Sequence, residues 1–112
     1  MVFVVARNWM LRAGVRAELR ERGIEALGME SSEDVGKALA EGTTPSAIVL
    51  DATEETPENP AFQQLARLVP VVLIASRTLK SPPFPAAAVL NRPVRIGDVV
   101  ACVCRILQGC TA

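Results

Sequence analysis

The amino-acid sequence predicts an α/β fold in which a doubly wound, parallel sheet of five strands lies between two layers of helices. Five short apolar runs are continuous rather than alternating, which is typical of strands that are covered on both faces. Amphipathic helical patterns separate most of these runs, and strands joined by helical crossovers form a parallel sheet. The five predicted strands are residues 2–6, 24–29, 47–50, 71–75 and 87–90.

The first helix is expected to begin after Asn8, because asparagine is a favourable N-cap residue, and to end before Gly23, a favourable residue just past a helix. Apolar residues at every fourth position predict the face that this helix buries. These residues are Leu11, Val15 and Leu19.

The second helix is expected between Ser31 and Gly42, since Ser31 and Asp34 have a spacing like that of a capping box. Asn59 as N-cap and Pro60 at the first helical position predict the start of the third helix. The predicted buried residues of the third helix are Phe62, Leu65, Ala66 and Val69.

The last helix, residues 96–107, has the clearest pattern in the chain. Its predicted apolar face consists of Ile96, Val99, Val100, Val103, Ile106 and Leu107. Between the fourth and fifth strands, Pro82, Pro83 and Pro85 are incompatible with a helix interior. We therefore expect the fourth of five possible helices to be lost or shortened to a turn.

Composition excludes several classes of partner. Twelve basic and twelve acidic side chains cancel and neither sign gathers in a tail, so no nucleic-acid partner is expected. No apolar segment reaches the roughly 18–20 residues that span a bilayer, so no membrane partner is expected. The start, MVFVVARN, lacks the basic lead-in of a secretory signal. We expect one cytoplasmic domain over residues 1–112.

Three cysteines, Cys102, Cys104 and Cys110, lie close together near the C-terminus. Their spacing matches no common zinc pattern, and the chain has no histidine to complete a metal site. Reduced thiols on a helix are the expected state, with redox chemistry or adventitious metal binding as the alternative.

The candidate functional residues follow the predicted strands. Ligands of an open parallel sheet bind beyond the carboxyl ends of its strands, and Asp51 comes directly after the third. This carboxylate is therefore the main candidate. Polar residues expected at the same edge are Arg7, Asn8, Ser76, Arg77, Asn91 and Arg92.

The arrangement of these elements resembles a response regulator receiver domain of bacterial two-component signalling, over essentially all 112 residues. The resemblance is carried by VFVVARN and the helix up to Gly23, by SAIVLD ending on Asp51, and by NRPV, which is similar to the family's lysine–proline turn. It implies a flavodoxin-like, CheY-like (βα)5 sandwich. It also implies that Asp51 occupies the position of the family's phosphoacceptor.

The same resemblance implies that parts of the phosphorylation site are missing. The family's acidic pair, which helps to hold Mg²⁺, corresponds to Ala6 and Arg7. Replacing a carboxylate by a guanidinium removes an oxygen ligand and adds repulsion, so neither Mg²⁺ nor another cofactor is expected. The family's strand-four hydroxyl, lysine and strand-five aromatic correspond to Ala75 (followed by Ser76), Arg92 and Val89.

Three interpretations of Asp51 remain open at this point. The favoured one is a retained carboxylate paired with Arg7 or Arg92, whose charge replaces that of a metal. The second is a working phosphoacceptor. In the third, Arg7, Arg92 and Ser76 clamp a small anion such as a nucleotide phosphate, although no glycine-rich loop follows the first strand.

The resemblance implies a binding module and no enzyme, with a protein partner such as a histidine kinase or another regulatory protein. Trp9 is expected to be buried, with an exposed anchor for a partner as the alternative. Small residues on the last helix, Ala101, Cys104 and Gly109, leave a side on which a homodimer could form, although solvent exposure is the default. The sequence thus predicts a pseudo-receiver with impaired Mg²⁺-dependent phosphorylation.

Overall fold

The computed structural model describes residues 1–53, 60–76 and 84–108. Within these ranges the chain forms five strands and four helices. In chain order they are β1 (Val2–Val5), α1 (Trp9–Glu21), β2 (Ala26–Met29), α2 (Ser32–Ala40), β3 (Ala47–Asp51), α3 (Pro60–Leu68), β4 (Val71–Ala75), β5 (Ala88–Asn91) and α4 (Ile96–Leu107).

The five strands form one parallel sheet in the order β2-β1-β3-β4-β5. This confirms the predicted doubly wound architecture. The chain moves outward in one direction from β1 to β2 and in the other from β3 to β5, so the order reverses between β1 and β3. The crevice beyond the carboxyl ends of these two strands is where ligands of such sheets bind.

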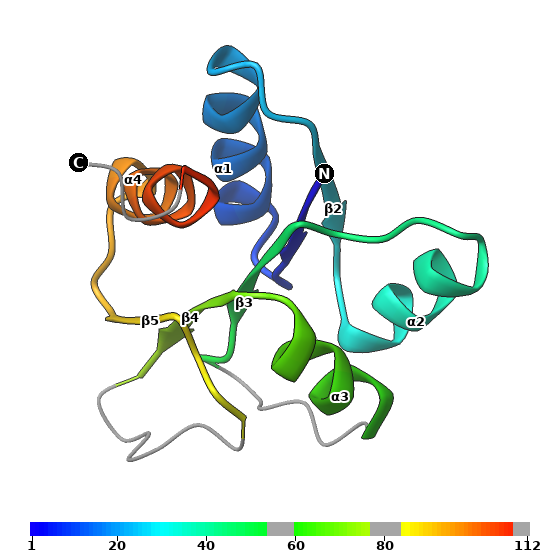
Figure 1. The fold of residues 1–112 in the computed structure, drawn as a ribbon. Coiled ribbons are helices and arrows are strands. Elements are labelled where there is room, and N and C mark those ends of the chain that lie inside the picture. Colours follow the sequence, from blue (N-terminus) through cyan, green and yellow to red (C-terminus); the bar gives the residue numbers. More distant parts are fainter. Residues whose placement is uncertain (54–59, 77–83, 109–112) are drawn as a thin grey trace.

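Helices cover both faces of the sheet, with α1 and α4 on one side and α2 and α3 on the other (Figure 1). Side chains alternate between the faces, so Val2 and Val4 of β1 pack in the core under α1 and α4, while Phe3 and Val5 pack in the core under α2 and α3. A strand buried on both faces needs apolar residues at consecutive positions. The continuous run in the sequence has this physical cause.

The ends of α1 are capped as predicted. The side-chain Oδ1 of Asn8 accepts hydrogen bonds from the backbone N–H groups of Met10 (3.0 Å) and Leu11 (3.2 Å). Gly23 follows the helix with φ +78°, a left-handed conformation that glycine adopts without strain. The predicted buried residues Leu11, Val15 and Leu19 are in the core.

The expected capping box of α2 is not formed. Ser31 is the N-cap residue, but its side chain makes no capping hydrogen bond. The carboxylate of Asp34 accepts a hydrogen bond from the backbone N–H of Glu30 (3.3 Å), one residue before the N-cap. Gly42 lies past the end of the helix with φ +91°, as expected of a terminating glycine. The cap residue proposed for α3, Asn59, lies outside the described residues.

Helix α3 buries Phe62, Leu65 and Ala66 as predicted, while Val69, expected to be buried, is half-buried just after the helix. Helix α4 has the predicted bounds. Leu107 was expected on its buried face but is 37% exposed at its end.

Gly14 allows α4 to pack close to α1, because a Cβ atom at this position would overlap the Cδ1 atom of Ile96. The side chain of Ile96 on α4 therefore packs against the backbone of α1 at Gly14.

Four residues of the expected proline loop, 84–87, are described, and they are not helical; Pro82 and Pro83 lie outside the described residues. Phe84 is only 4% exposed and packs edge-to-face on Phe62, with ring centroids 5.7 Å apart. A single aromatic ring thus joins this segment to the core beside α3.

The expectation that Trp9 is buried was wrong. Trp9 is 67% exposed and Met10 is 65% exposed at the start of α1. Among the described residues, no helix is long and apolar enough to cross a membrane.

Candidate functional site

Asp51 is the last residue of β3, at the carboxyl edge of the sheet and next to the point where strand order reverses. The parallel ladder sets it beside Ile74 of β4. Its side chain is only 8% exposed. A carboxylate with so little contact with water needs hydrogen-bond donors from the protein.

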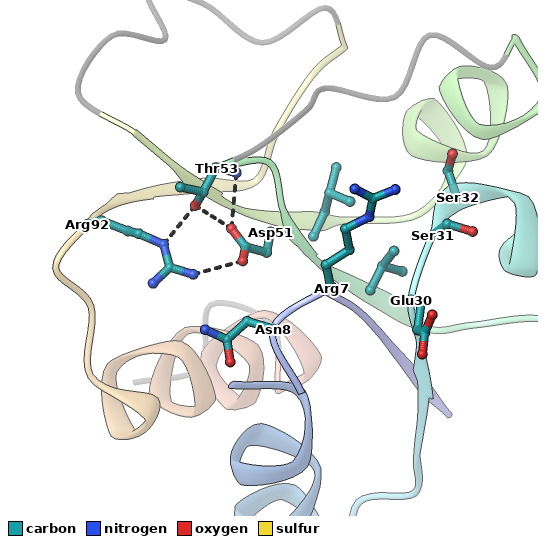
Figure 2. A pocket seen from close by; sticks show the side chains of 10 residues that line it. Arg7, Asn8, Glu30, Ser31, Ser32, Asp51, Thr53 and Arg92 are labelled. Atoms are coloured by element: carbon teal, nitrogen blue, oxygen red, sulfur yellow. Dashed lines mark hydrogen bonds and ion pairs between the residues drawn. The ribbon is translucent and has the colours of Figure 1, made fainter. Parts of the chain in front are cut away.

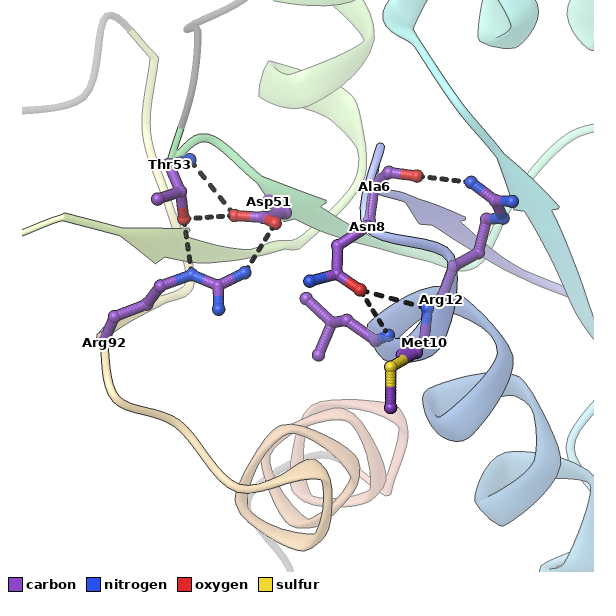
Figure 3. A network of polar contacts seen from close by, with 8 residues as sticks. Ala6, Asn8, Met10, Arg12, Asp51, Thr53 and Arg92 are labelled. Carbon is purple, nitrogen blue, oxygen red and sulfur yellow. Dashed lines mark hydrogen bonds and ion pairs between the residues drawn. The ribbon is translucent and has the colours of Figure 1, made fainter.

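Arg92 and Thr53 supply these donors (Figure 3). The Nη2 atom of Arg92 lies 2.8 Å from Oδ2 of Asp51, forming an ion pair. The other carboxylate oxygen, Oδ1, accepts hydrogen bonds from the backbone N–H of Thr53 (3.1 Å) and from its hydroxyl. The Nε–H of Arg92 in turn donates to the Thr53 hydroxyl oxygen at 2.7 Å. Asp51, Thr53 and Arg92 therefore form a closed ring of hydrogen bonds.

Arg92 reaches this ring because of its place in the sheet. It follows β5, and its backbone N–H donates to the carbonyl of Ala75 at the end of β4 (3.0 Å). The side chain then crosses the end of β4 to reach Asp51 on β3. The two donor atoms that it uses, Nε and Nη2, belong to one planar group and point in fixed directions, which suits a pair of neighbouring acceptors.

Arg7 does not pair with Asp51. It is exposed after β1, and Figure 2 shows its side chain extending away from Asp51, on the side of Ser32 and α2. Of the two cations proposed as partners of Asp51, Arg92 is therefore the one that forms the pair. Asn8 lies between them at the edge, with its carboxamide oxygen committed to capping α1.

The remaining edge residues are more scattered. Ala75 is fully buried, and Ser76 is half-buried but does not line the pocket at Asp51. Asn91 is exposed and does not line this pocket either, and Arg77 lies outside the described residues. Ser76 thus does not join the proposed anion clamp. Val89, at the position of the family's aromatic residue, is 45% exposed.

A pocket of about 240 Å³ opens beside Asp51 (Figure 2). The predicted site residues Arg7, Asn8, Asp51 and Arg92 all line it. Four polar residues that the sequence analysis missed also line it: Glu30, Ser31, Ser32 and Thr53. Two signals could have found them. The carboxyl-end rule applies equally to β2, which Glu30 follows, and an aspartate side chain commonly binds the backbone N–H two residues on, which here belongs to Thr53.

Among the residues that the structure describes, the side chains at this edge do not fit Mg²⁺. A hard cation needs several oxygen ligands, but Asp51 is already paired with Arg92, and neither Ala6 nor Arg7 supplies a side-chain oxygen. The guanidinium groups of Arg7 and Arg92 line the same pocket and would repel the ion. In the described part of the chain, no group of three or more His, Cys, Asp or Glu side chains could hold a metal ion.

Cys102 and Cys104 lie on α4, far along the chain from this edge. Cys102 is buried, and Cys104 is half-buried, with its Sγ atom 3.8 Å from Nη1 of Arg22. Cys110 lies outside the described residues. Cys102 and Cys104 are both free thiols.

The structure is similar to solved structures of receiver proteins along nearly the whole chain. A response regulator receiver protein from Burkholderia phymatum has a TM-score of 0.77 at 22% identity, covering 96% of this chain and 94% of that chain. One from Sinorhizobium medicae WSM419 has a TM-score of 0.77 at 17% identity, with coverages of 96% and 94%. One from Pseudomonas putida has a TM-score of 0.74 at 20% identity, with coverages of 93% and 94%.

No protein-family model matches the chain, and no curated protein matches it in sequence. Structural similarity at identities this low establishes the fold alone, so the function of this chain has to be argued from its site. The chain therefore has the CheY-like fold of response regulator receiver domains.

Proposed function

We propose that this chain is an atypical receiver domain, a pseudo-receiver, that acts in signal transduction by binding another protein. Its Mg²⁺-dependent phosphorylation on Asp51 is impaired. The ion pair between Asp51 and Arg92, at 2.8 Å, is the observation that carries this proposal.

Phosphorylation of an aspartate requires one carboxylate oxygen to attack phosphorus, forming an O–P bond while the bond from phosphorus to the leaving group breaks. Both oxygens of Asp51 are hydrogen-bonded to neighbouring side chains or backbone. Oδ1 accepts two hydrogen bonds from Thr53, so Oδ2 would have to attack, and its hydrogen bond to the Arg92 guanidinium lowers its nucleophilicity. No carboxylate at position 6 or 7 is present to hold a metal ion against the incoming phosphoryl group. The barrier to phosphoryl transfer is therefore raised on both counts.

A module that does not switch by phosphorylation still has surfaces for partners. Trp9 and Met10 are the largest exposed apolar side chains beside the pocket residues Arg7 and Asn8. Aromatic anchors surrounded by polar residues often dominate protein interfaces. We therefore assign this corner to a protein partner, a histidine kinase or another regulatory protein.

Homodimerisation through α4 is the alternative contact. Ala101 is exposed and Cys104 half-buried on this helix, while Gly109 lies outside the described residues. Sedimentation of the purified chain over a range of concentrations tests it, and an arginine at Ala101 should abolish any dimer that uses this face.

The proposal is tested by incubating the chain with acetyl phosphate and Mg²⁺ and measuring its intact mass. We expect no gain of a phosphoryl group, because Asp51 is occupied by Arg92 and the metal ligands are missing. The matched control is Asp51→Asn, which removes the only proposed acceptor. A phosphoryl group gained by the natural chain and not by the Asn variant would overturn the proposal and favour a working phosphoacceptor.

A small-anion sensor is supported by one observation, the Arg7 guanidinium on the wall of the pocket beside Asp51. Its volume of about 240 Å³ is below the roughly 300–1,000 Å³ of typical ligand pockets, which argues against a whole nucleotide. Thermal-shift measurements with phosphate, acetate and adenine nucleotides test this function. Stabilisation by phosphate at millimolar concentration and none by chloride would support it.

A further inference from the structure

We propose that Thr53 is a positioning residue that holds the Arg92 guanidinium on Asp51. This inference rests on the proposed pseudo-receiver function, because it explains how Asp51 is kept occupied. Thr53 is half-buried on the wall of the pocket and contacts both charged partners.

The donors of Arg92 are divided between two residues. Nη2 donates to Asp51 Oδ2 (2.8 Å) and Nε donates to Thr53 Oγ1 (2.7 Å). In the usual bidentate arrangement both donors would reach the same carboxylate. Here the Thr53 hydroxyl takes the place of one carboxylate oxygen. One of the two hydrogen bonds that Arg92 donates within the ring therefore depends on Thr53.

The direction of the hydroxyl proton follows from these contacts. A guanidinium can only donate, so Thr53 Oγ1 must accept from Arg92 with a lone pair. A hydroxyl has one proton, and the remaining partner is Asp51 Oδ1, which accepts it. The hydroxyl thus relays the hydrogen bonding from Arg92 to the second carboxylate oxygen, and each of its contacts strengthens the other.

The position of Thr53 is fixed by its backbone as well. Its N–H donates to Asp51 Oδ1 at 3.1 Å, which closes a local turn in which an aspartate side chain binds the N–H two residues on. Threonine is β-branched and has few rotamers, so the hydroxyl loses little freedom in reaching its partners. Without that hydroxyl, Nε of Arg92 has no acceptor in the ring, and the guanidinium is held by one hydrogen bond.

Exchange of the Arg92 Nε–H proton with solvent, measured by NMR on the full chain, reports on the hydrogen bond from Nε to the Thr53 hydroxyl. Thr53→Val keeps the shape of the side chain and removes the hydroxyl. Thr53→Ala also removes the hydroxyl and leaves a smaller side chain. Loss of one charge-assisted hydrogen bond should accelerate the exchange about tenfold. Thr53→Ser keeps a hydroxyl and should restore slow exchange. Thr44→Val makes the same chemical change at an exposed loop position and should leave Arg92 unaffected.

A rate that is unchanged in the Val and Ala variants would overturn the role of Thr53, as would failure of serine to restore slow exchange. Neither result would alter the pseudo-receiver proposal, which is decided separately by phosphorylation of the natural chain with acetyl phosphate. Conversely, phosphorylation of the natural chain would overturn the proposed function, whatever the exchange rate of Arg92 in the variants.

Discussion

The guanidinium of Arg92 is joined to the carboxylate of Asp51 by an ion pair of 2.8 Å that spans the end of β4. The pair ties the end of β5 to the end of β3, two strands that are not neighbours in the sheet. It is partly shielded from water, with side-chain exposures of 34% for Arg92 and 8% for Asp51. Such a pair is held more firmly than an ion pair on an open surface.

A double-mutant cycle measures this interaction. Asp51→Ala and Arg92→Ala, made singly and together, should show a coupling free energy of about 1–2 kcal/mol, above the usual value for exposed pairs. The measurement is urea denaturation of the four proteins. Additive effects of the two single changes would show that the pair contributes nothing to stability.

The missing acidic pair can be restored. In the double variant Ala6→Asp, Arg7→Asp, two carboxylates would follow β1, one of them at the buried position 6, and one positive charge would leave the pocket wall, so Mg²⁺ affinity should rise. Mg²⁺ titration followed by NMR, with circular dichroism as a check on folding, is the measurement. Arg7→Ala is the matched control, because it removes the charge without adding an oxygen ligand. Equal Mg²⁺ response in the control and the double variant would contradict the role given to the carboxylates.

The close approach of α4 to α1 predicts different effects for two helical glycines. Gly36 of α2 has open space around its missing Cβ, so Gly36→Ala should stabilise the fold by up to about 1 kcal/mol through helix propensity. At Gly14 the same change would push against Ile96, and the gain should be cancelled or reversed. Thermal unfolding of both variants compares them, and equal stabilisation would show that α1 and α4 do not meet at Gly14.

The exposure of Trp9 can be read directly, since it is the only tryptophan in the chain. Its fluorescence should be red-shifted and readily quenched by acrylamide, as for an indole in water. Trp9→Ala should change the free energy of unfolding by less than about 0.5 kcal/mol, in line with other exposed positions. Blue-shifted emission that resists quenching at low protein concentration would mean that the ring is covered.

The fold was largely predictable because the three central strands, β1, β3 and β4, are buried on both faces, which leaves continuous apolar runs in the sequence. The carboxyl-end rule also placed Asp51 and Arg92 at one edge. The choice of Arg92 over Arg7 was not predictable, because it depends on where two long side chains point from β1 and β5, which lie on opposite sides of β3. Thr53 carries no charge and belongs to no recognisable motif, and its contact with Asp51 depends on a local turn that the Asp51 side chain itself closes.

The error at Trp9 has a simple geometric cause. The buried face of α1 is set by Leu11 and its successors, and Trp9 lies two residues earlier, about 200° around the helix. The helical period therefore predicts exposure. The size of the indole ring favoured burial only as a general tendency.

Titration of the natural chain with Mg²⁺, followed through the NMR signals of Asp51, Thr53 and Arg92, tests most directly whether a guanidinium has replaced the metal at this edge. We expect no saturable change in these signals at millimolar Mg²⁺, since Asp51 is paired with Arg92, Arg7 adds a second positive charge to the pocket, and positions 6 and 7 supply no carboxylate. Saturable shifts centred on Asp51, with release of Arg92, would contradict the account.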